Sequence, residues 1–307
     1  MPEQSIEHIR SMIARHKLWD HIFAIVGILS LMVGILTLLA LFTELAIEGA
    51  PRIGWKLFTS FPSRHPEEAG ILSAWVGTTL IMLVTAASAV PLGVASAVYL
   101  EEYARKNWLT AIIEINVTNL AGVPSIVYGL LALGLFVYKL DFGQSILSAG
   151  LTLALLILPI VIVSTREAIR AVPGSIREAA YALGATKWQT VRDHVLPYSL
   201  GGILTGTIMG LSRAIGETAP IITIGALTFI AFLPQSPFSA VFPFVSFKWL
   251  MDPFTVMPIQ MFNWTSRPEA AFQHNAAAAG VILLIMTLIM NGIAIYIRYR
   301  FRKRIKW

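Results

Sequence analysis

The chain has 307 residues, of which 56% are hydrophobic and only 13% are charged. Soluble domains carry about a quarter charged residues, so this composition excludes an ordinary soluble domain and indicates an integral membrane protein. The net charge is +6, but six basic residues crowd positions 298–307, which favours anchoring at a membrane surface over nucleic-acid binding. The absence of cysteine excludes disulfides, thiol catalysis and cysteine-ligated metal sites.

The first apolar run covers residues 23–43 and is long enough to span the hydrocarbon core of a bilayer. A secretory signal has a shorter apolar region, of roughly 7 to 15 residues, followed by a small-residue cleavage pattern. Glu44 and Glu48 follow this run instead. We therefore expect a retained transmembrane helix, preceded by a polar N-terminal segment at residues 1–22.

Five further apolar runs follow, at residues 71–100, 112–138, 146–164, 200–233 and 275–297. Together with the first run they predict an all-α, polytopic membrane protein with six transmembrane helices. Placing both termini in the cytoplasm assigns sixteen Lys and Arg residues to that side and six to the other. By the positive-inside rule, we expect both termini to be cytoplasmic.

Two prolines interrupt these runs. Pro124, in the third run, removes one helical hydrogen bond; Ser125 or Tyr128 can satisfy the freed backbone group or face a cavity. Ordinary helix kinking explains Pro124 equally well, because proline is frequent in membrane helices. Pro220, near the middle of the fifth run, predicts a broken or kinked helix that exits into the outer loop.

A polar, helical stretch, EAAYALGATKWQTVRDHVLP, occupies residues 178–197 between the fourth and fifth runs. It starts a helix with an acidic residue, has a central glycine that helices tolerate, and closes on a proline that we expect to end a helix. The stretch resembles the EAA loop of ABC importer permeases, which implies a short coupling helix seated in a cleft of a separate ATPase. A solvated amphipathic loop helix is the alternative. The residues assigned to ATPase coupling are Glu178, Ala179, Ala180, Gly184, Leu196 and Pro197.

A charged pair, Arg213 and Glu217, lies inside the fifth run at a spacing that puts both side chains on one helix face. A guanidinium at mid-membrane costs about 2.5 to 3.5 kcal/mol, so such residues normally face a bundle interior or an aqueous cavity. The pair is therefore a candidate for the substrate pathway or its gate, and a planar guanidinium suits oxyanion recognition. The alternative is that Glu217 only neutralises Arg213 and fixes the helix register.

A stripe of small residues, Gly202, Gly206 and Gly210, recurs every fourth residue on the same predicted helix. Such stripes let a second helix approach closely in a membrane. We assign these glycines to helix packing, together with Pro124 and Pro220.

The largest outer loop, residues 234–273, contains six prolines that argue against long regular elements. We expect its aromatic side chains to rest at the lipid interface. A docking surface for an extracytoplasmic binding protein is the alternative. The aromatic residues are Phe238, Phe242, Phe244, Phe247, Trp249, Phe254, Phe262 and Trp264.

Two segments resemble one branch of the ABC permeases: RAIGETAP at residues 213–220 and LAGVPSIVYG at residues 120–129. Both are similar to permease subunits of bacterial phosphate ABC importers. The resemblance implies a type I ABC importer permease fold in the bacterial inner membrane, with Arg213 and Glu217 along the translocation path or gate. The implied partners are a second, PstC-like permease, a PstB-like ATPase dimer and a PstS-like extracytoplasmic phosphate-binding protein.

From the apolar runs, the distribution of Lys and Arg and this resemblance, we expect four parts. Residues 1–22 form a cytoplasmic N-terminal segment, and residues 23–70 form the first transmembrane helix and an external loop. Residues 71–297 form the ABC permease core, with a cytoplasmic coupling loop at residues 165–198. Residues 298–307 form a basic cytoplasmic tail.

Motifs of energy conversion and catalysis are absent from the sequence. It has no GxxxxGK[ST] phosphate loop, no HExxH and no GxSxG. We expect a non-catalytic subunit that binds no cofactor or metal and relies on ATP used by a partner ATPase. Two alternatives remain: a permease for another oxyanion, such as sulfate or molybdate, or an ion-coupled secondary transporter in which the intramembrane pair acts as a relay.

Overall fold

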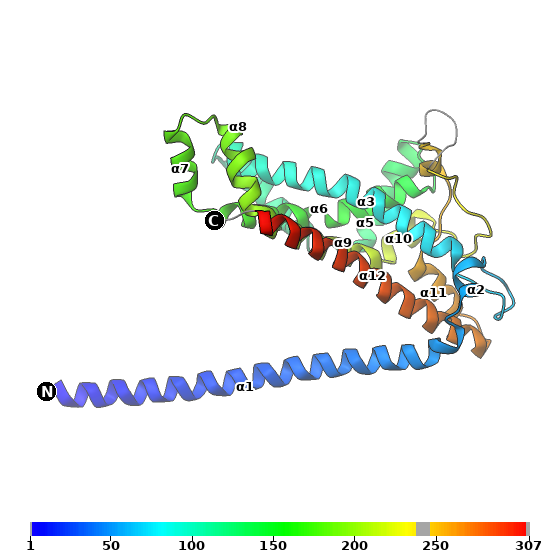
Figure 1. Cartoon of the computed structure of the whole chain (residues 1–307), viewed down its shortest axis with the longest axis horizontal. Helices are drawn as coiled ribbons and strands as arrows, with labels where there is room; N and C mark the ends of the chain where they lie inside the picture. Colours follow the sequence, from blue (N-terminus) through cyan, green and yellow to red (C-terminus); the bar gives the residue numbers. More distant parts are fainter. Residues whose placement is uncertain (1, 238–245, 305–307) are drawn as a thin grey trace.

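The computed structural model describes residues 2–237 and 246–304, which form helices and connecting loops without a β-strand among them. Five of the described helices are long and apolar enough to cross a membrane, and a bent pair supplies a sixth span when counted as one. The predicted all-α, polytopic fold is confirmed. The helices are α1 (Pro2–Gly49), α2 (Trp55–Thr59), α3 (Leu72–Val98), α4 (Trp108–Leu120), α5 (Ser125–Ala132), α6 (Ile146–Arg170), α7 (Gly174–Ala182), α8 (Lys187–Thr190), α9 (Leu196–Gly216), α10 (Ala219–Ile224), α11 (Met257–Thr265) and α12 (Ala270–Arg304) (Figure 1).

The centre of the bundle is α6, which packs against α3 on one side and α9 on another. Its sequence is apolar around most of the helix, and Leu153, Leu156 and Ile157 are buried. A helix that is hydrophobic all round belongs in such an interior position. The close packing of α6 against α3 depends on Gly150 of α6, because a Cβ there would lie 2.5 Å from the Cβ of Val84 in α3.

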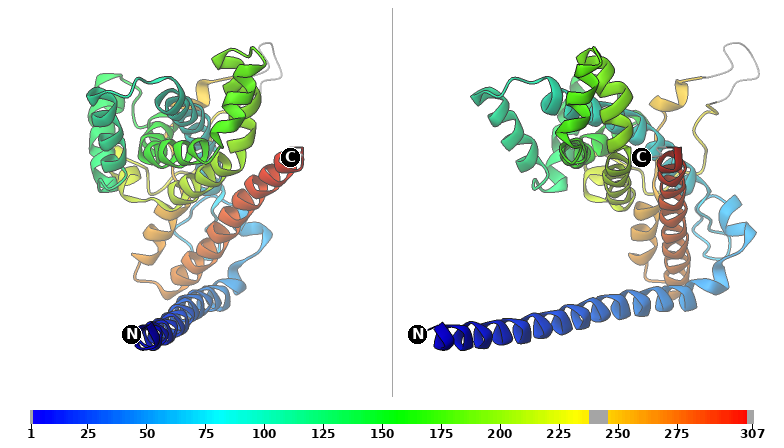
Figure 2. Two further views of the ribbon diagram at one scale, coloured as in Figure 1. Left: turned by 90° about the vertical axis from the view of Figure 1, so that its left-hand side faces the viewer. Right: turned by 60° about the vertical axis from the view of Figure 1, so that its left-hand side comes forward.

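Helix α1 diverges from the rest of the molecule (Figure 2). It meets α12 near its C-terminal end, where a Cβ on Gly49 would lie 2.6 Å from the backbone nitrogen of Ala278. The large apolar side chains between Leu18 and Phe42 are exposed. The predicted first span lies within this single long helix, with no break at residue 22 or 43.

The third apolar run, predicted as one span with a kink at Pro124 as one interpretation, does not form a single straight helix. It forms α4 and α5, which meet at an angle of 106° across residues 121–124. Pro124 caps α5 and has no N–H to continue α4, so the chain turns there. The Tyr128 hydroxyl donates a hydrogen bond of 2.7 Å to the Leu120 carbonyl, satisfying one group that the bend leaves open.

The fifth apolar run breaks, as Pro220 predicted. Helix α9 ends at Gly216, Glu217 is extended, and Pro220 lies in the first turn of α10. Helix α10 ends at Gly225, whose φ of +99° favours glycine. The remainder of the predicted run is not helical in the described residues.

The outer loop folds back against the bundle instead of lying at the lipid interface throughout. It contains the nine-residue helix α11, and Trp249, Phe254 and Trp264 are buried in the core. Phe247 and Phe262 are exposed, as an interfacial position requires. Phe238, Phe242 and Phe244 lie outside the described residues. The interfacial prediction is therefore wrong for the three buried side chains, because packing against α3 and α12 competes with the interface for aromatic area.

Candidate functional site

Helices α7 and α8 project from one end of the bundle, the end at which α12 also finishes; the N-terminal end of α1 points in the same direction but lies apart from the bundle (Figure 1). Pro173 precedes the first residue of α7, and Thr186 caps α8. The Thr186 hydroxyl accepts from the Gln189 amide at 3.3 Å, and the Gln189 side chain accepts from the Thr186 amide at 2.8 Å. This reciprocal capping box defines where α8 starts.

Two expectations for residues 178–197 are wrong, one for Glu178 and one for Gly184. Glu178 does not start a helix, because α7 already begins at Gly174, directly after Pro173. Gly184 is not inside a helix; it has a φ of +83° and forms the turn between α7 and α8. A left-handed backbone ends a helix, and glycine adopts it without steric cost.

The expected helix end at Leu196 and Pro197 is also wrong. Pro197 lies in the first turn of α9, and the helical span continues from Lys187 to Gly216. A π-helical turn at Val191–Val195 precedes the proline. Such a turn shifts the hydrogen-bond register, so the helix accommodates a residue that lacks an N–H donor.

The projecting helices have one buried side and one exposed apolar side. Val191 and Val195 are buried against Ile169 and Val172 at the end of α6, and Ala180 is buried as well. Three large apolar side chains point outward: Leu183 is 89% exposed, Trp188 55% and Tyr181 44%. We call these three residues the α7–α8 tip. An apolar cluster of this kind on a projecting turn marks an interaction surface.

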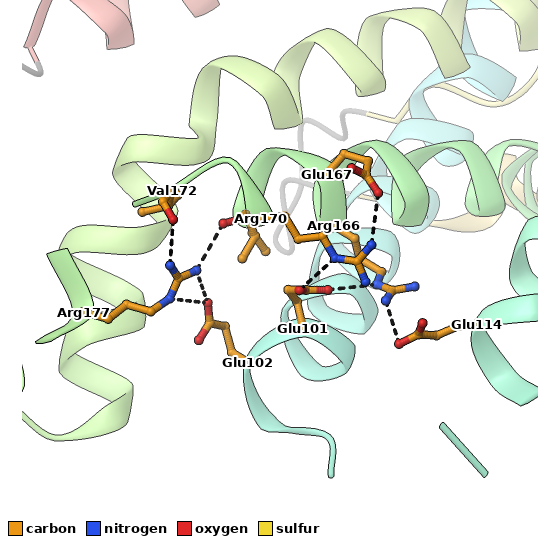
Figure 3. A network of polar contacts seen from close by, with 9 residues as sticks. Glu101, Glu102, Glu114, Arg166, Glu167, Arg170, Val172 and Arg177 are labelled. Atoms are coloured by element: carbon orange, nitrogen blue, oxygen red, sulfur yellow. Dashed lines mark hydrogen bonds and ion pairs between the residues drawn. The ribbon is translucent and has the colours of Figure 1, made fainter. Parts of the chain in front are cut away.

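A charged cluster of Glu101, Glu102, Glu114, Arg166 and Arg177 lies where α7 joins the bundle (Figure 3). Arg166 of α6, with a side chain 7% exposed, has Nε 3.3 Å from Glu101 Oε2 and Nη2 2.6 Å from Glu114 Oε1 in α4. Arg177 of α7 donates from Nε and Nη2 to Glu102 Oε1 at 3.1 and 2.7 Å. Glu101 and Glu102 are consecutive in the π-helical turn that continues α3.

Sequence reasoning missed the charged cluster, because it treated the arginines only as evidence for topology. The available signal was two carboxylates directly after one apolar run and arginines at the end of another. Buried charges require such partners, so the contacts hold the ends of the helices together. Among the described residues, no group of three or more His, Asp or Glu side chains is placed to hold a metal ion.

The charged pair of the fifth run lies at the end of α9. Arg213 Nε is 3.1 Å from Glu217 Oε1, although Glu217 has already left the helix. The side chain of Arg213 is 38% exposed and that of Glu217 is 19% exposed. The guanidinium therefore faces outward from this chain with a carboxylate beside it, and it retains donors for another partner.

The glycines of α9 face α6. A Cβ on Gly202 would lie 2.5 Å from the Cβ of Ala168, and a Cβ on Gly206 would overlap the Ser164 side chain. Gly210 lies against Ile157, at a Cβ distance of 3.4 Å. Pro220 is buried, and its backbone would lie 2.7 Å from a Cβ on Gly129 of α5.

The sequence matches the family described as "Binding-protein-dependent transport system inner membrane component" over residues 89–307. It is 31% identical to the phosphate transport system permease protein PstA of Yersinia pestis, covering 89% of this chain and 88% of that protein. It is 35% identical to PstA of Mycobacterium leprae, covering 70% and 72%, and 30% identical to the probable ABC transporter permease YqgI of Bacillus subtilis, covering 83% and 86%.

Among solved structures, the fold is similar to a chain of the methionine ABC transporter MetNI in an inward-facing conformation. The TM-score is 0.57 at 17% identity, and the match covers 73% of this chain and 93% of that one. The likeness supports the type I importer permease fold. The chain is a multi-pass membrane protein that belongs to the family of inner membrane components of binding-protein-dependent transport systems.

Proposed function

We propose that this chain is the non-catalytic permease subunit that forms half of the membrane pathway of an ATP-driven phosphate importer. Relatives that cover most of the chain at 31% and 35% identity are phosphate transport permeases, which supports phosphate as the substrate. The sequence lacks a phosphate-binding loop for ATP, so a separate ATPase supplies the energy.

The α7–α8 tip is the observation that carries the coupling part of this proposal. Leu183 is almost fully exposed on a turn between two short helices, and aromatic side chains flank it. Exposed apolar groups on a projecting element are stabilised by burial in a partner. In an ABC permease that partner is the ATPase, whose closure would push on α7 and α8.

The outward-facing Arg213 supports the pathway part. It lies roughly 25 Å along α9 from Leu196, at a helical rise of 1.5 Å per residue. It thus lies in the last turn of α9, far from the α7–α8 tip, and because a charged side chain within a membrane span normally faces protein or water, its exposed face belongs against one of these. A pathway formed between this chain and a second permease provides both, and phosphate can take the guanidinium bidentately.

The assembly that follows contains a second, PstC-like permease, two PstB-like ATPase subunits and a PstS-like phosphate-binding protein. The α7–α8 tip and both termini face the cytoplasm, which agrees with the distribution of Lys and Arg. The end of the bundle with α2 and α11 faces the binding protein.

Reconstitution of the four components in proteoliposomes tests this function by ATP-dependent uptake of radiolabelled phosphate. The double variant Glu178→Lys plus Gly184→Asp is expected to lose uptake, while Asp193→Asn, an exposed change in the same segment, retains it. Undiminished uptake by the double variant would refute coupling through α7 and α8. Competition by sulfate or molybdate at equal concentration would refute phosphate selectivity.

A further inference from the structure

The charged cluster connects the projecting helix α7 to α4 through a continuous series of ionic contacts. Arg177 of α7 holds Glu102, the neighbouring Glu101 holds Arg166, and Arg166 holds Glu114 of α4. Glu101 and Glu102 are adjacent in one π-helical turn, so a displacement of that turn carries both carboxylates. The series therefore runs between the candidate coupling element and half of the bent third span.

Arg177 attaches α7 to the bundle at more than one point. Besides Glu102, its guanidinium donates to the Val172 carbonyl at 2.9 Å and to the Ile169 carbonyl at 3.1 Å. The Ile169 carbonyl belongs to the last turn of α6 and Val172 lies two residues beyond it, at the end of the helix where a cation also interacts favourably with the helix dipole. A displacement of α7 must therefore carry Arg177 and its carboxylate partner with it or break several charge-assisted hydrogen bonds.

Helix α4 is the element that such a series can move. None of its residues is buried, and it precedes the bend of 106° that separates it from α5. Its ionic attachment to the bundle is the contact of 2.6 Å between Glu114 and Arg166. A cleft of about 390 Å³, lined by Glu114, Asn119, Arg166 and Arg170, lies between α4 and α6 and gives α4 space to shift.

The buried side of this attachment is Arg166, whose side chain is 7% exposed, whereas that of Glu114 is 34% exposed. Arg166 Nη2 pairs with Glu114 by charge and distance without hydrogen-bond geometry, and removing Glu114 would leave a buried guanidinium with Glu101 as its remaining carboxylate. By contrast, in the nearby pair of Arg170 and Glu167 the side chains are 46% and 65% exposed, although Arg170 also has Nε 2.9 Å from Glu101 Oε1. Exposed pairs of that kind contribute little.

We propose that the charged cluster is a joint that transmits the displacement of α7 to α4, so that its five residues act as positioning residues for the transport cycle. The proposal rests on the proposed function, because it requires an ATPase that moves α7. It goes further by assigning the route: α7 moves Glu102 through Arg177, and Glu101 then moves α4 through Arg166 and Glu114.

The test follows the position of α4 in the complete transporter complex, in the nucleotide-free and vanadate-trapped states. The chain has no cysteine, so spin labels on Ile113→Cys in α4 and Met209→Cys in α9, both exposed positions, report one distance when the partner subunits are made cysteine-free. The expected result is a shift in that distance between the two states. Arg177→Gln and Glu102→Gln are each expected to abolish the shift and to lower phosphate transported per ATP hydrolysed by about tenfold.

The exchange Glu102→Arg plus Arg177→Glu restores the opposite charges and is expected to recover the shift, at least in part. The matched control, Glu167→Gln, removes an exposed carboxylate at the same end of α6 and is expected to leave the shift intact. Cross-linking from Leu183→Cys to the ATPase is measured in parallel samples that carry this cysteine alone. A persistent α4 shift in Arg177→Gln, or no recovery in an exchange variant that assembles, would overturn the joint.

The failure of the proposed function would look different. Without a Leu183 adduct to the ATPase in the otherwise unchanged chain, the coupling assignment itself fails. If the adduct forms but the distance between the labels on α4 and α9 is the same in the nucleotide-free and vanadate-trapped states, only the proposal of the joint is refuted. If the single variants do not assemble, the exchange variant decides: recovery of assembly without recovery of the shift reduces the charged cluster to a purely structural role.

Discussion

The backbone of a single residue, Gly184, determines the shape of the projecting α7–α8 element. Its φ of +83° is unfavourable for residues with a Cβ, yet a Cβ built there meets nothing within 4 Å. Position 184 therefore favours glycine because of its backbone conformation and not because neighbouring atoms would collide with a side chain. This separates the effect of a substitution on the turn from any effect on packing.

Gly184→Val is expected to destabilise the α7–α8 turn by about 1 to 2 kcal/mol, because a β-branched residue pays the left-handed penalty. Gly184→Asn is the matched control, since asparagine tolerates this region. Hydrogen exchange of the α7 and α8 amides measures the effect, with faster exchange expected for valine alone. Equal exchange in both variants would show that the turn does not depend on the left-handed residue.

The charge of Arg213 is expected to be needed for transport and not for assembly. Arg213→Gln removes the outward-facing cation, and we expect uptake to fall at least about tenfold while the complex still forms. Arg213→Lys retains the charge without the planar fork and is expected to be intermediate. Wild-type uptake by Arg213→Gln, measured in the reconstituted complex, would remove this residue from the pathway.

At the scale of elements, the contact of α6 with α9 depends on small residues. Gly206→Val would force a side chain into Ser164, and overpacking of this kind costs about 1 to 3 kcal/mol. Gly201→Ala lies on the same helix with nothing within 4 Å of its Cβ, so no loss is expected. Thermal unfolding of the detergent-purified chain compares the two. A similar unfolding temperature for both variants would mean that α6 and α9 separate more easily than the structure shows.

The apolar runs predicted the existence of the helices well, because length and hydropathy are local properties of the sequence. A kink at Pro124 was one of the two interpretations of the sequence, but neither its size of 106° nor the continuous helix through Pro197 was predicted. Each proline removes the same hydrogen bond, and the outcome depends on whether a partner such as the Tyr128 hydroxyl or a π-helical turn is available. That availability is decided by tertiary structure.

The candidate site likewise contains contacts that the sequence predicts and contacts that only the tertiary structure reveals. The sequence predicts the contact of Arg213 with Glu217, but the expectation that both lie on one helix face is wrong, because Glu217 is extended beyond the end of α9. The charged cluster joins residues far apart in the chain, such as Glu102 and Arg177, and no local pattern reveals which carboxylate meets which guanidinium. The α7–α8 tip was also missed, because exposure of Leu183 follows from the turn at Gly184.

For the whole molecule, the arrangement separates two functions along the bundle. The α7–α8 tip and the charged cluster lie at the end of the bundle where α12 finishes, and Arg213 lies further along, where α9 breaks. The exposed guanidinium and the long exposed helix α1 leave protein surface available for a neighbouring subunit. The chain thus has the features of half a transport pathway that is driven from one end.

The central claim is that an ATPase engages the α7–α8 tip, and cross-linking in the purified complex tests it most directly. A photoactivatable label on Leu183→Cys is expected to form an adduct with the ATPase, whereas the same label on Phe262→Cys in α11, at the opposite end of the bundle, is expected to form none (Figure 1). Because the chain has no native cysteine, each label occupies one position. An ATPase adduct from Phe262 and none from Leu183 would contradict the account.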